Sequence, residues 1–99
     1  MYVVRDIMHC KPGKVRAMVE KFQAINKLGK EAGFGTMRVM TDIAAERYWT
    51  VVSEMEVSSL EEHEQTSKKM MADPRFQEAM KGYHDLVEDG RREIYTLEK

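Results

Sequence analysis

The stretch Tyr2-Val-Val-Arg-Asp-Ile-Met-His-Cys10 decides the fold of this 99-residue chain. Most of its residues are β-branched or apolar, and they show no helical period. The stretch ends at Lys11-Pro12-Gly13, which is a turn signal. We therefore predict a strand here, and the rest of the fold is built outward from it.

A helix is predicted after this turn. From Lys14 to about Lys30, apolar residues recur at spacings of three and four, which places them on one helical stripe. The Gly33-Phe34-Gly35 cluster ends this region, because glycine can adopt the left-handed conformation that a helix exit needs. The stripe consists of Val15, Met18, Val19, Phe22, Ile25 and Leu28.

Two further strands are predicted at Thr36 to Ile43 and at Arg47 to Val57, joined as a hairpin by a short polar connection. A second helix begins near Leu60. Ser58 or Ser59 provides its capping box, because a glutamate follows each serine three residues later.

The second helix is predicted to break at Asp73-Pro74, since aspartate suits an N-cap and proline suits the first helical position. A third helix then runs through Val87, and Gly90 is expected to stop it. The last strand covers Arg91 to Leu97. The buried stripe of the third helix is predicted to be Phe76, Ala79, Met80, Tyr83, Leu86 and Val87.

This order of elements predicts one α+β domain over residues 1–99 with a ferredoxin-like βαββαβ fold. In that topology a four-stranded antiparallel sheet has its first and third strands in the centre and its helices on one face.

The strands carry apolar residues on both faces. In the first strand, Val4 and Met8 lie on one side, while Val3 and Ile7 lie on the other. Helices from one chain cover only one face of a sheet. We therefore expect a homodimer, in which a second subunit covers the other face.

Composition limits the class of protein. Sixteen basic and seventeen acidic residues nearly cancel, so the chain is not expected to bind nucleic acid. Apolar runs are too short to span a bilayer, and Arg5 and Asp6 interrupt any signal-peptide core, so we expect no membrane association. With Cys10 as the single cysteine, a cytoplasmic location is expected.

Three segments carry a family resemblance: Arg5 through Lys14, Asp73-Pro74-Arg75-Phe76, and Gly90-Arg91-Arg92-Glu93-Ile94-Tyr95. Together they resemble the NIPSNAP-like branch of the dimeric α-β barrel superfamily, over almost the whole chain. The resemblance implies the topology and the dimer. It also implies relatives that include cofactor-independent antibiotic-biosynthesis-type monooxygenases, haem-degrading enzymes and small proteins with no assigned activity.

Ionisable residues within the two-sided strands need partners or a function, because an unpaired buried charge is costly. One interpretation is ion pairing across strands or at the dimer seam. In the other, the guanidinium forks of Arg5 and Arg38 anchor the carboxylate or enolate of a small ligand. The residues concerned are Arg5, Asp6, Arg38, Asp42 and Glu54.

Trp49, Tyr83 and His84 form a second candidate cluster. A tryptophan on a central strand could face the third helix, where Tyr83 and His84 lie at the edge of the buried stripe. A space between sheet and helices at that point could hold an aromatic ligand. The alternative is a core tryptophan with a tyrosine whose hydroxyl reaches the surface.

The remaining candidates are His9, Cys10 and His63. His9 and Cys10 are adjacent and so point to opposite faces of a strand, which prevents joint metal binding. His63 lies in a charged stretch and is expected on a solvated helix face, while Cys10 is expected to be a buried inert thiol. No metal-binding spacing is present, and we expect neither a metal nor a cofactor.

Three functions stay open. The first is a non-enzymatic dimer that binds a small organic ligand or another protein. The second is a cofactor-independent monooxygenase for an aromatic or quinol substrate, in which His84 or His9 accepts a proton. The third is a haem-binding or haem-degrading protein with His84 as axial ligand.

Overall fold

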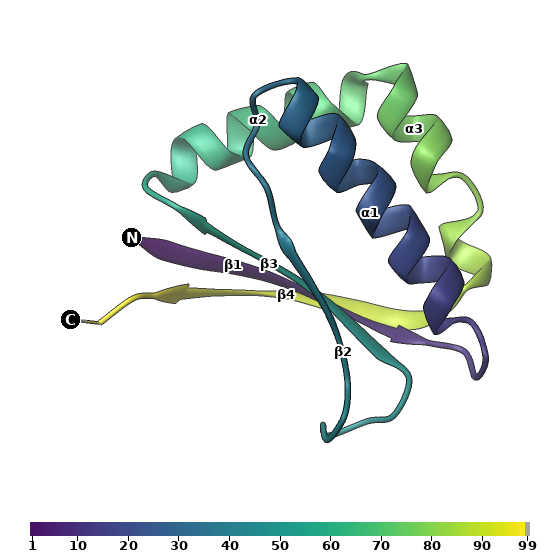
Figure 1. Cartoon of the computed structure of the whole chain (residues 1–99). Helices are drawn as coiled ribbons and strands as arrows, with labels where there is room; N and C mark the ends of the chain where they lie inside the picture. The colour runs from purple at the N-terminus through teal and green to yellow at the C-terminus, as the bar shows by residue number, and fades with distance from the viewer. Residues whose placement is uncertain (99) are drawn as a thin grey trace.

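The computed structural model describes residues 1–98, so Lys99, the last residue of the predicted domain, lies outside the described part. One four-stranded sheet in the order β2-β3-β1-β4 has all helices on one face, as Figure 1 shows. This confirms the predicted α+β, ferredoxin-like fold with the first and third strands central. The elements are β1 (Tyr2–Cys10), α1 (Val15–Glu31), β2 (Arg38–Thr41), β3 (Thr50–Val57), α2 (Leu60–Ala72), α3 (Pro74–Met80), the 3-10 helix η1 (Tyr83–Asp85) and β4 (Val87–Thr96).

Strand β1 pairs antiparallel with β3 on one side and with β4 on the other. The register places Val4 beside Met55 and Ile94, and these side chains share the face toward the helices. Val3 and Ile7 belong to the other face, which we call the open face, because no helix covers it (Figure 1). Both residues are buried, which confirms that β1 carries apolar side chains on both sides.

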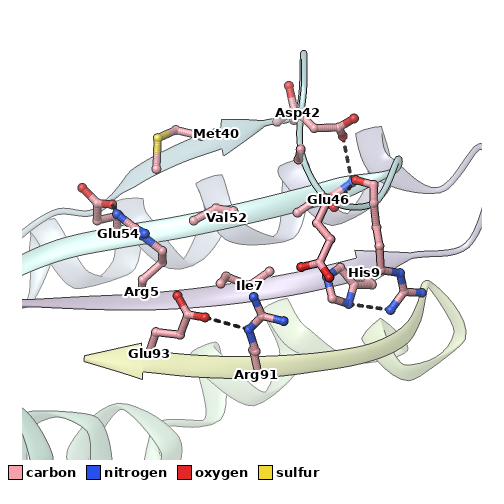
Figure 2. Close-up of a pocket in the computed structure, with 14 residues that line it drawn as sticks. Arg5, Ile7, His9, Met40, Asp42, Glu46, Val52, Glu54, Arg91 and Glu93 are labelled. Carbon is pink, nitrogen blue, oxygen red and sulfur yellow. Dashed lines mark hydrogen bonds and ion pairs between the residues drawn. The ribbon is translucent and has the colours of Figure 1, made fainter. Parts of the chain in front are cut away.

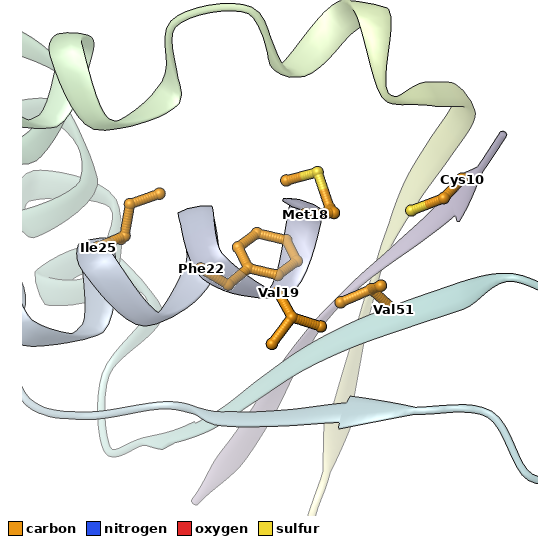
Figure 3. Packing of buried hydrophobic residues seen from close by; sticks show 6 residues of the cluster. All are labelled: Cys10, Met18, Val19, Phe22, Ile25 and Val51. Carbon is orange, nitrogen blue, oxygen red and sulfur yellow. The ribbon is translucent and has the colours of Figure 1, made fainter. Parts of the chain in front are cut away.

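The hydrophobic core lies between α1 and the sheet, as Figure 3 shows. Met18 of α1 and Val51 of β3 are fully buried, and Phe22 and Ile25 extend the cluster along the helix. Burial of one large apolar side chain stabilises a protein by about 1.5–3 kcal/mol, so this stripe fixes α1 on the sheet. The predicted stripe of α1 is therefore confirmed for these residues.

Helices α2 and α3 begin with the predicted caps. The Ser59 hydroxyl accepts a hydrogen bond from the Glu62 amide at 3.2 Å, and the Asp73 carboxylate accepts one from the Arg75 amide at 2.8 Å. Each cap satisfies one of the free amides at a helix start. The boundaries near Leu60 and at Asp73-Pro74 are therefore confirmed.

The prediction for the C-terminal third was wrong about where the helix ends. Helix α3 stops at Met80, because Gly82 has a φ of 82° and turns the chain out of the helix. Tyr83, Leu86 and Val87 still pack against the core, but from η1 and the start of β4. The periodic pattern thus identified the side chains that pack against the core, while Gly82 determined where the helix ends.

Gly90 does not end a helix; it lies within β4 opposite Met8. A Cβ atom at this position would lie 2.7 Å from Met8 Sδ and 3.2 Å from the Ile7 carbonyl oxygen. The glycine leaves room for the Met8 side chain, which lies against it, and avoids a tight contact with the backbone of β1. Strand β4 consequently begins at Val87, earlier than the predicted Arg91.

The β2–β3 hairpin is confirmed, but both strands are shorter than predicted. Strand β2 covers Arg38–Thr41 and β3 starts only at Thr50, so residues 42–49 form a longer connection. The Asn26 side chain on α1 bonds both the amide and the carbonyl of Met37, which fixes the entry into β2. Within residues 1–98, no helix combines the length and apolarity needed to cross a membrane.

Replacing Gly90 with alanine should destabilise the protein by about 1–3 kcal/mol, because the new methyl group must displace Met8 and meets a fixed backbone oxygen. Urea unfolding would measure the change. Gly29→Ala is the control, since its Cβ would keep 3.4 Å from its nearest neighbour and would replace a glycine within α1. Equal stability of Gly90→Ala and the wild type would contradict this account of the close approach.

Candidate functional site

A hollow of about 370 Å³ lies on the open face of the sheet, and we call it the open-face hollow. Ile7 and Val52 form its apolar floor, and charged side chains from β1, β3, β4 and the β2–β3 connection surround this floor, as Figure 2 shows. Among the charged residues that line it are Arg5, Asp42, Glu46, Arg47, Glu54, Arg91 and Glu93, together with His9. Apolar floor and polar walls are the usual composition of a small-molecule site.

The open-face hollow lies on the opposite side of the sheet from the ligand space that we predicted. Between sheet and helices, Met18, Phe22 and Val51 fill the centre of the layer (Figure 3). Protein cores pack at the density of organic crystals, so these side chains leave no room for a ligand where they meet. The layer is filled at this point, whereas a hollow is present on the open face, so we take the open face as the candidate site.

Arg5 and Arg38 share one carboxylate. Arg5 donates to Glu54 Oε2 from Nε at 2.9 Å and from Nη2 at 2.7 Å, while Arg38 Nη2 donates to Oε1. The hydrogen bonds from Arg5, and to a smaller extent that from Arg38, lower the pKa of Glu54 below its ordinary value of 4.5, against the opposing effect of burial. Arg5 also lies over the ring of Tyr95, with its guanidinium carbon 5.4 Å from the ring centre. The cross-strand pairing considered above is therefore present, and ligand anchoring by Arg5 and Arg38 stays a prediction.

His9 is buried at one end of the open-face hollow, in a network with Asp89 and Arg47. Its Nδ1 contacts Asp89 Oδ1 and also lies 2.8 Å from Arg47 Nη1. A carboxylate cannot donate a proton to Nδ1, so Nδ1 must carry the hydrogen and donate it to Asp89. Arg47 then binds Asp89: its Nη1 donates a hydrogen bond to Oδ2 at 3.0 Å. In this tautomer, the nitrogen of an uncharged His9 ring that carries the free lone pair is Nε2.

The His9 and Arg47 hydrogen bonds, in that order, lower the pKa of Asp89, so the carboxylate stays ionised. The sequence reasoning missed Asp89 and Arg47. Asp89 is opposite His9 because β4 begins at Val87, whereas we predicted a strand from Arg91. A prediction that placed the helix exit at Gly82 would have found this pair.

Trp49 does not lie on β3, contrary to the prediction of a central-strand tryptophan. It precedes the strand with a φ of 63° and lines a second hollow together with Tyr48 and Asp42. Tyr83 and His84 lie on η1, where their ring centres are 4.0 Å apart. Neither residue lines the hollow beside Trp49. The predicted cluster is therefore divided between two regions, because α3 ends before Tyr83.

His63 and Cys10 complete the set of candidates. His63 is not on a solvated face; its Nε2 is buried without a partner in the described chain, and burial, followed by the charge of Arg92, lowers its pKa. Cys10 is buried, as expected, and burial raises its pKa; that the thiol is inert stays a prediction. Residues 1–98 hold no group of three or more side chains that could bind a metal ion.

Glu54 should make stability depend on pH. Because its pKa is lower in the folded protein, the contribution is complete above the ordinary value of 4.5 and is lost as the pH falls through the folded value. At neutral pH, Glu54→Gln should cost about 1–2 kcal/mol, and its difference from the wild type should shrink in acid. Urea unfolding at several pH values measures this, with the exposed Glu56→Gln as control. A difference that is constant with pH would contradict it.

No family model and no curated protein matches the chain. Among solved structures, protein Atu4242 from Agrobacterium tumefaciens is similar with a TM-score of 0.85 and 18% identity, over 100% of this chain and 95% of that one. An uncharacterised NIPSNAP domain protein from Burkholderia xenovorans gives 0.82 and 17%, over 99% and 95%. A candidate antibiotic biosynthesis monooxygenase from Nitrosomonas europaea gives 0.72 and 14%, over 98% of each chain. The chain thus has the fold of NIPSNAP family proteins and of antibiotic biosynthesis monooxygenase-like proteins.

Proposed function

We propose that this chain works as a homodimer that binds a small organic ligand on the open face of its sheet. The observation that carries the ligand proposal is the open-face hollow. Its volume of about 370 Å³ falls in the range of small-molecule sites, roughly 300–1,000 Å³. Its floor of Ile7 and Val52 suits an apolar or aromatic ring, and the polar walls supply orientation.

The dimer proposal rests on the same face. Met40 and Tyr95 belong to its outer strands and are 40% and 48% exposed, while the helices cover only the other side. Acidic and basic residues alternate across the face, as in the Arg5–Glu54 and Arg91–Glu93 pairs. A surface that carries both positive and negative charges can pack against the same surface of a second subunit about a two-fold axis without like-charge repulsion. A second sheet stacked on this face would also close the hollow from solvent.

A monooxygenase that needs no cofactor is the second candidate function. The His9–Asp89 pair favours it, because Asp89 orients the imidazole so that Nε2 is free to accept a proton from a phenol or quinol. The substrate anion would then reduce dioxygen, with one oxygen atom entering the product and the other leaving as water. The neighbouring monooxygenase-like fold is compatible with this candidate without deciding it. Haem binding through His84 stays a prediction.

The combined substitution Met40→Glu and Tyr95→Glu should convert the dimer to a monomer, because it places like charges on both copies of the open face. Both side chains are exposed in the single chain, so the monomer should keep its circular dichroism spectrum. Light scattering would measure the mass. Leu60→Glu with Met71→Glu adds the same charge on α2 and is the matched control. A wild type that is monomeric at micromolar concentration would contradict the dimer.

A panel of small phenols, quinols and aromatic polyketides should include compounds that raise the melting temperature of the wild type. His9→Gln should keep binding, since glutamine preserves polar contacts, and should abolish oxygen uptake if the second candidate is right. An oxygen electrode and thermal melts with the same compounds separate the two candidates. Thermal shifts without oxygen uptake would support ligand binding and contradict the monooxygenase. A panel in which no compound raises the melting temperature would contradict both candidate functions.

A further inference from the structure

The connection between β2 and β3 carries two aromatic side chains that do not line the open-face hollow. Tyr48 is 80% exposed and Trp49 is 44% exposed, although large aromatic side chains contribute most when buried. The two residues are adjacent and directly precede β3. Their exposure in a domain this small calls for a physical explanation.

Trp49 is held in a strained backbone conformation. Its φ of 63° lies in the left-handed region, which costs a bulky residue about 1–3 kcal/mol and persists only where neighbouring contacts impose it. Here the Cys10 amide donates to the Trp49 carbonyl at 2.8 Å, and the Thr50 amide donates to Asp42 Oδ1 at 2.8 Å. The Thr50 hydroxyl donates to the Arg47 carbonyl at 2.8 Å. The backbone of Trp49 is thus held by β1 and by both ends of the connection.

This conformation places Trp49 beside a second hollow, of about 350 Å³, which we call the aromatic hollow. Tyr48, Trp49, Asp42, Thr41 and Val15 line it. It is adjacent to the open-face hollow, with which it shares Thr41 and Asp42, but it contains none of the strand residues on the floor of that hollow. Two aromatic rings, one aliphatic side chain and one carboxylate therefore surround the same space.

The charge in the aromatic hollow is negative. Of the five residues that line it within the described chain, Asp42 is the one with a formal charge, and the faces of aromatic rings such as those of Tyr48 and Trp49 carry partial negative charge. Asp42 uses Oδ1 for the Thr50 amide, which leaves Oδ2 for a ligand. The partial positive charge where α1 begins, about half an elementary charge, offsets the full charge of Asp42 only in part.

We propose that the aromatic hollow of Tyr48, Trp49 and Asp42 binds an organic cation of the alkylammonium class. Aromatic rings attract such a cation through their quadrupoles, and a nearby carboxylate adds a direct Coulomb attraction. A quaternary ammonium group fits best, because it is weakly hydrated and its methyl groups can contact both rings and Val15. The proposal does not rest on the proposed function on the open face, although the two hollows share Thr41 and Asp42.

The single tryptophan of the chain makes the test direct, because the fluorescence of the protein at tryptophan excitation reports on Trp49 alone. Titrating the full chain with choline or tetramethylammonium should give a saturable change in emission. The neutral isostere 3,3-dimethyl-1-butanol should bind about tenfold more weakly, since it lacks the charge. Sodium chloride at matched ionic strength should give no saturable change.

Two variants place the binding in the aromatic hollow. Tyr48→Ala removes an exposed ring, and Asp42→Asn removes the charge while keeping the oxygen that accepts from the Thr50 amide. Each should weaken choline binding by roughly five- to tenfold. Ile43→Ala is the matched control, because Ile43 is 99% exposed in the same connection and does not line the hollow. It should bind choline as the wild type does.

Circular dichroism confirms that each variant is folded before its affinity is compared. The proposal is overturned if choline and its neutral isostere bind equally, if an anion such as acetate binds as well as choline, or if the Tyr48 and Asp42 variants keep the wild-type affinity. It is also overturned if the emission of Trp49 does not respond to choline and has the short wavelength typical of a buried indole. That result would mean that a second copy of the chain covers the ring.

Discussion

The pairing of β1 with strands on both of its sides is the constraint on which the rest of the structure depends. Residues 2–9 of β1 each have a neighbour on β3 and a neighbour on β4, so this register fixes which side chains of the three strands lie side by side. It places Arg5 between Glu54 and Glu93, and it places His9 beside Asp89. The candidate site is a consequence of this register, because its ion pairs join residues that are far apart in the sequence.

The two faces of the sheet use β1 in different ways. Toward the helices, Val4 is buried, and Cys10 joins the packed core beside α1. On the open face, Val3 and Ile7 are buried as well, although no helix lies above them. The register places the long side chains of Tyr95 and Arg91 directly beside them, and such side chains can cover apolar atoms while their polar ends stay in water. This arrangement gives the open face an apolar floor and charged walls.

Two glycines decide which residues reach the candidate site. Gly82 ends α3 early, so the chain has enough length to begin β4 at Val87 and to bring Asp89 beside His9. Gly90 then allows β4 to lie close to β1 at Met8. In the connection before β3, a bulky residue instead of a glycine adopts a positive φ: Trp49 is held in this strained conformation by backbone hydrogen bonds. Local backbone geometry therefore separates the region of Trp49 from that of Tyr83 and His84.

The sequence by itself determined the order of elements, the two-sided burial of β1, the stripe of α1 and the caps at Ser59 and Asp73. These features depend on residue periodicity and on local hydrogen bonds, which neighbours in the chain decide. Only the tertiary structure decided that Arg5 and Arg38 share Glu54, that His9 pairs with Asp89, and that the hollow lies on the open face. Those contacts depend on strand register and on the length of each connection, and a shift of one residue would turn each side chain to the other face.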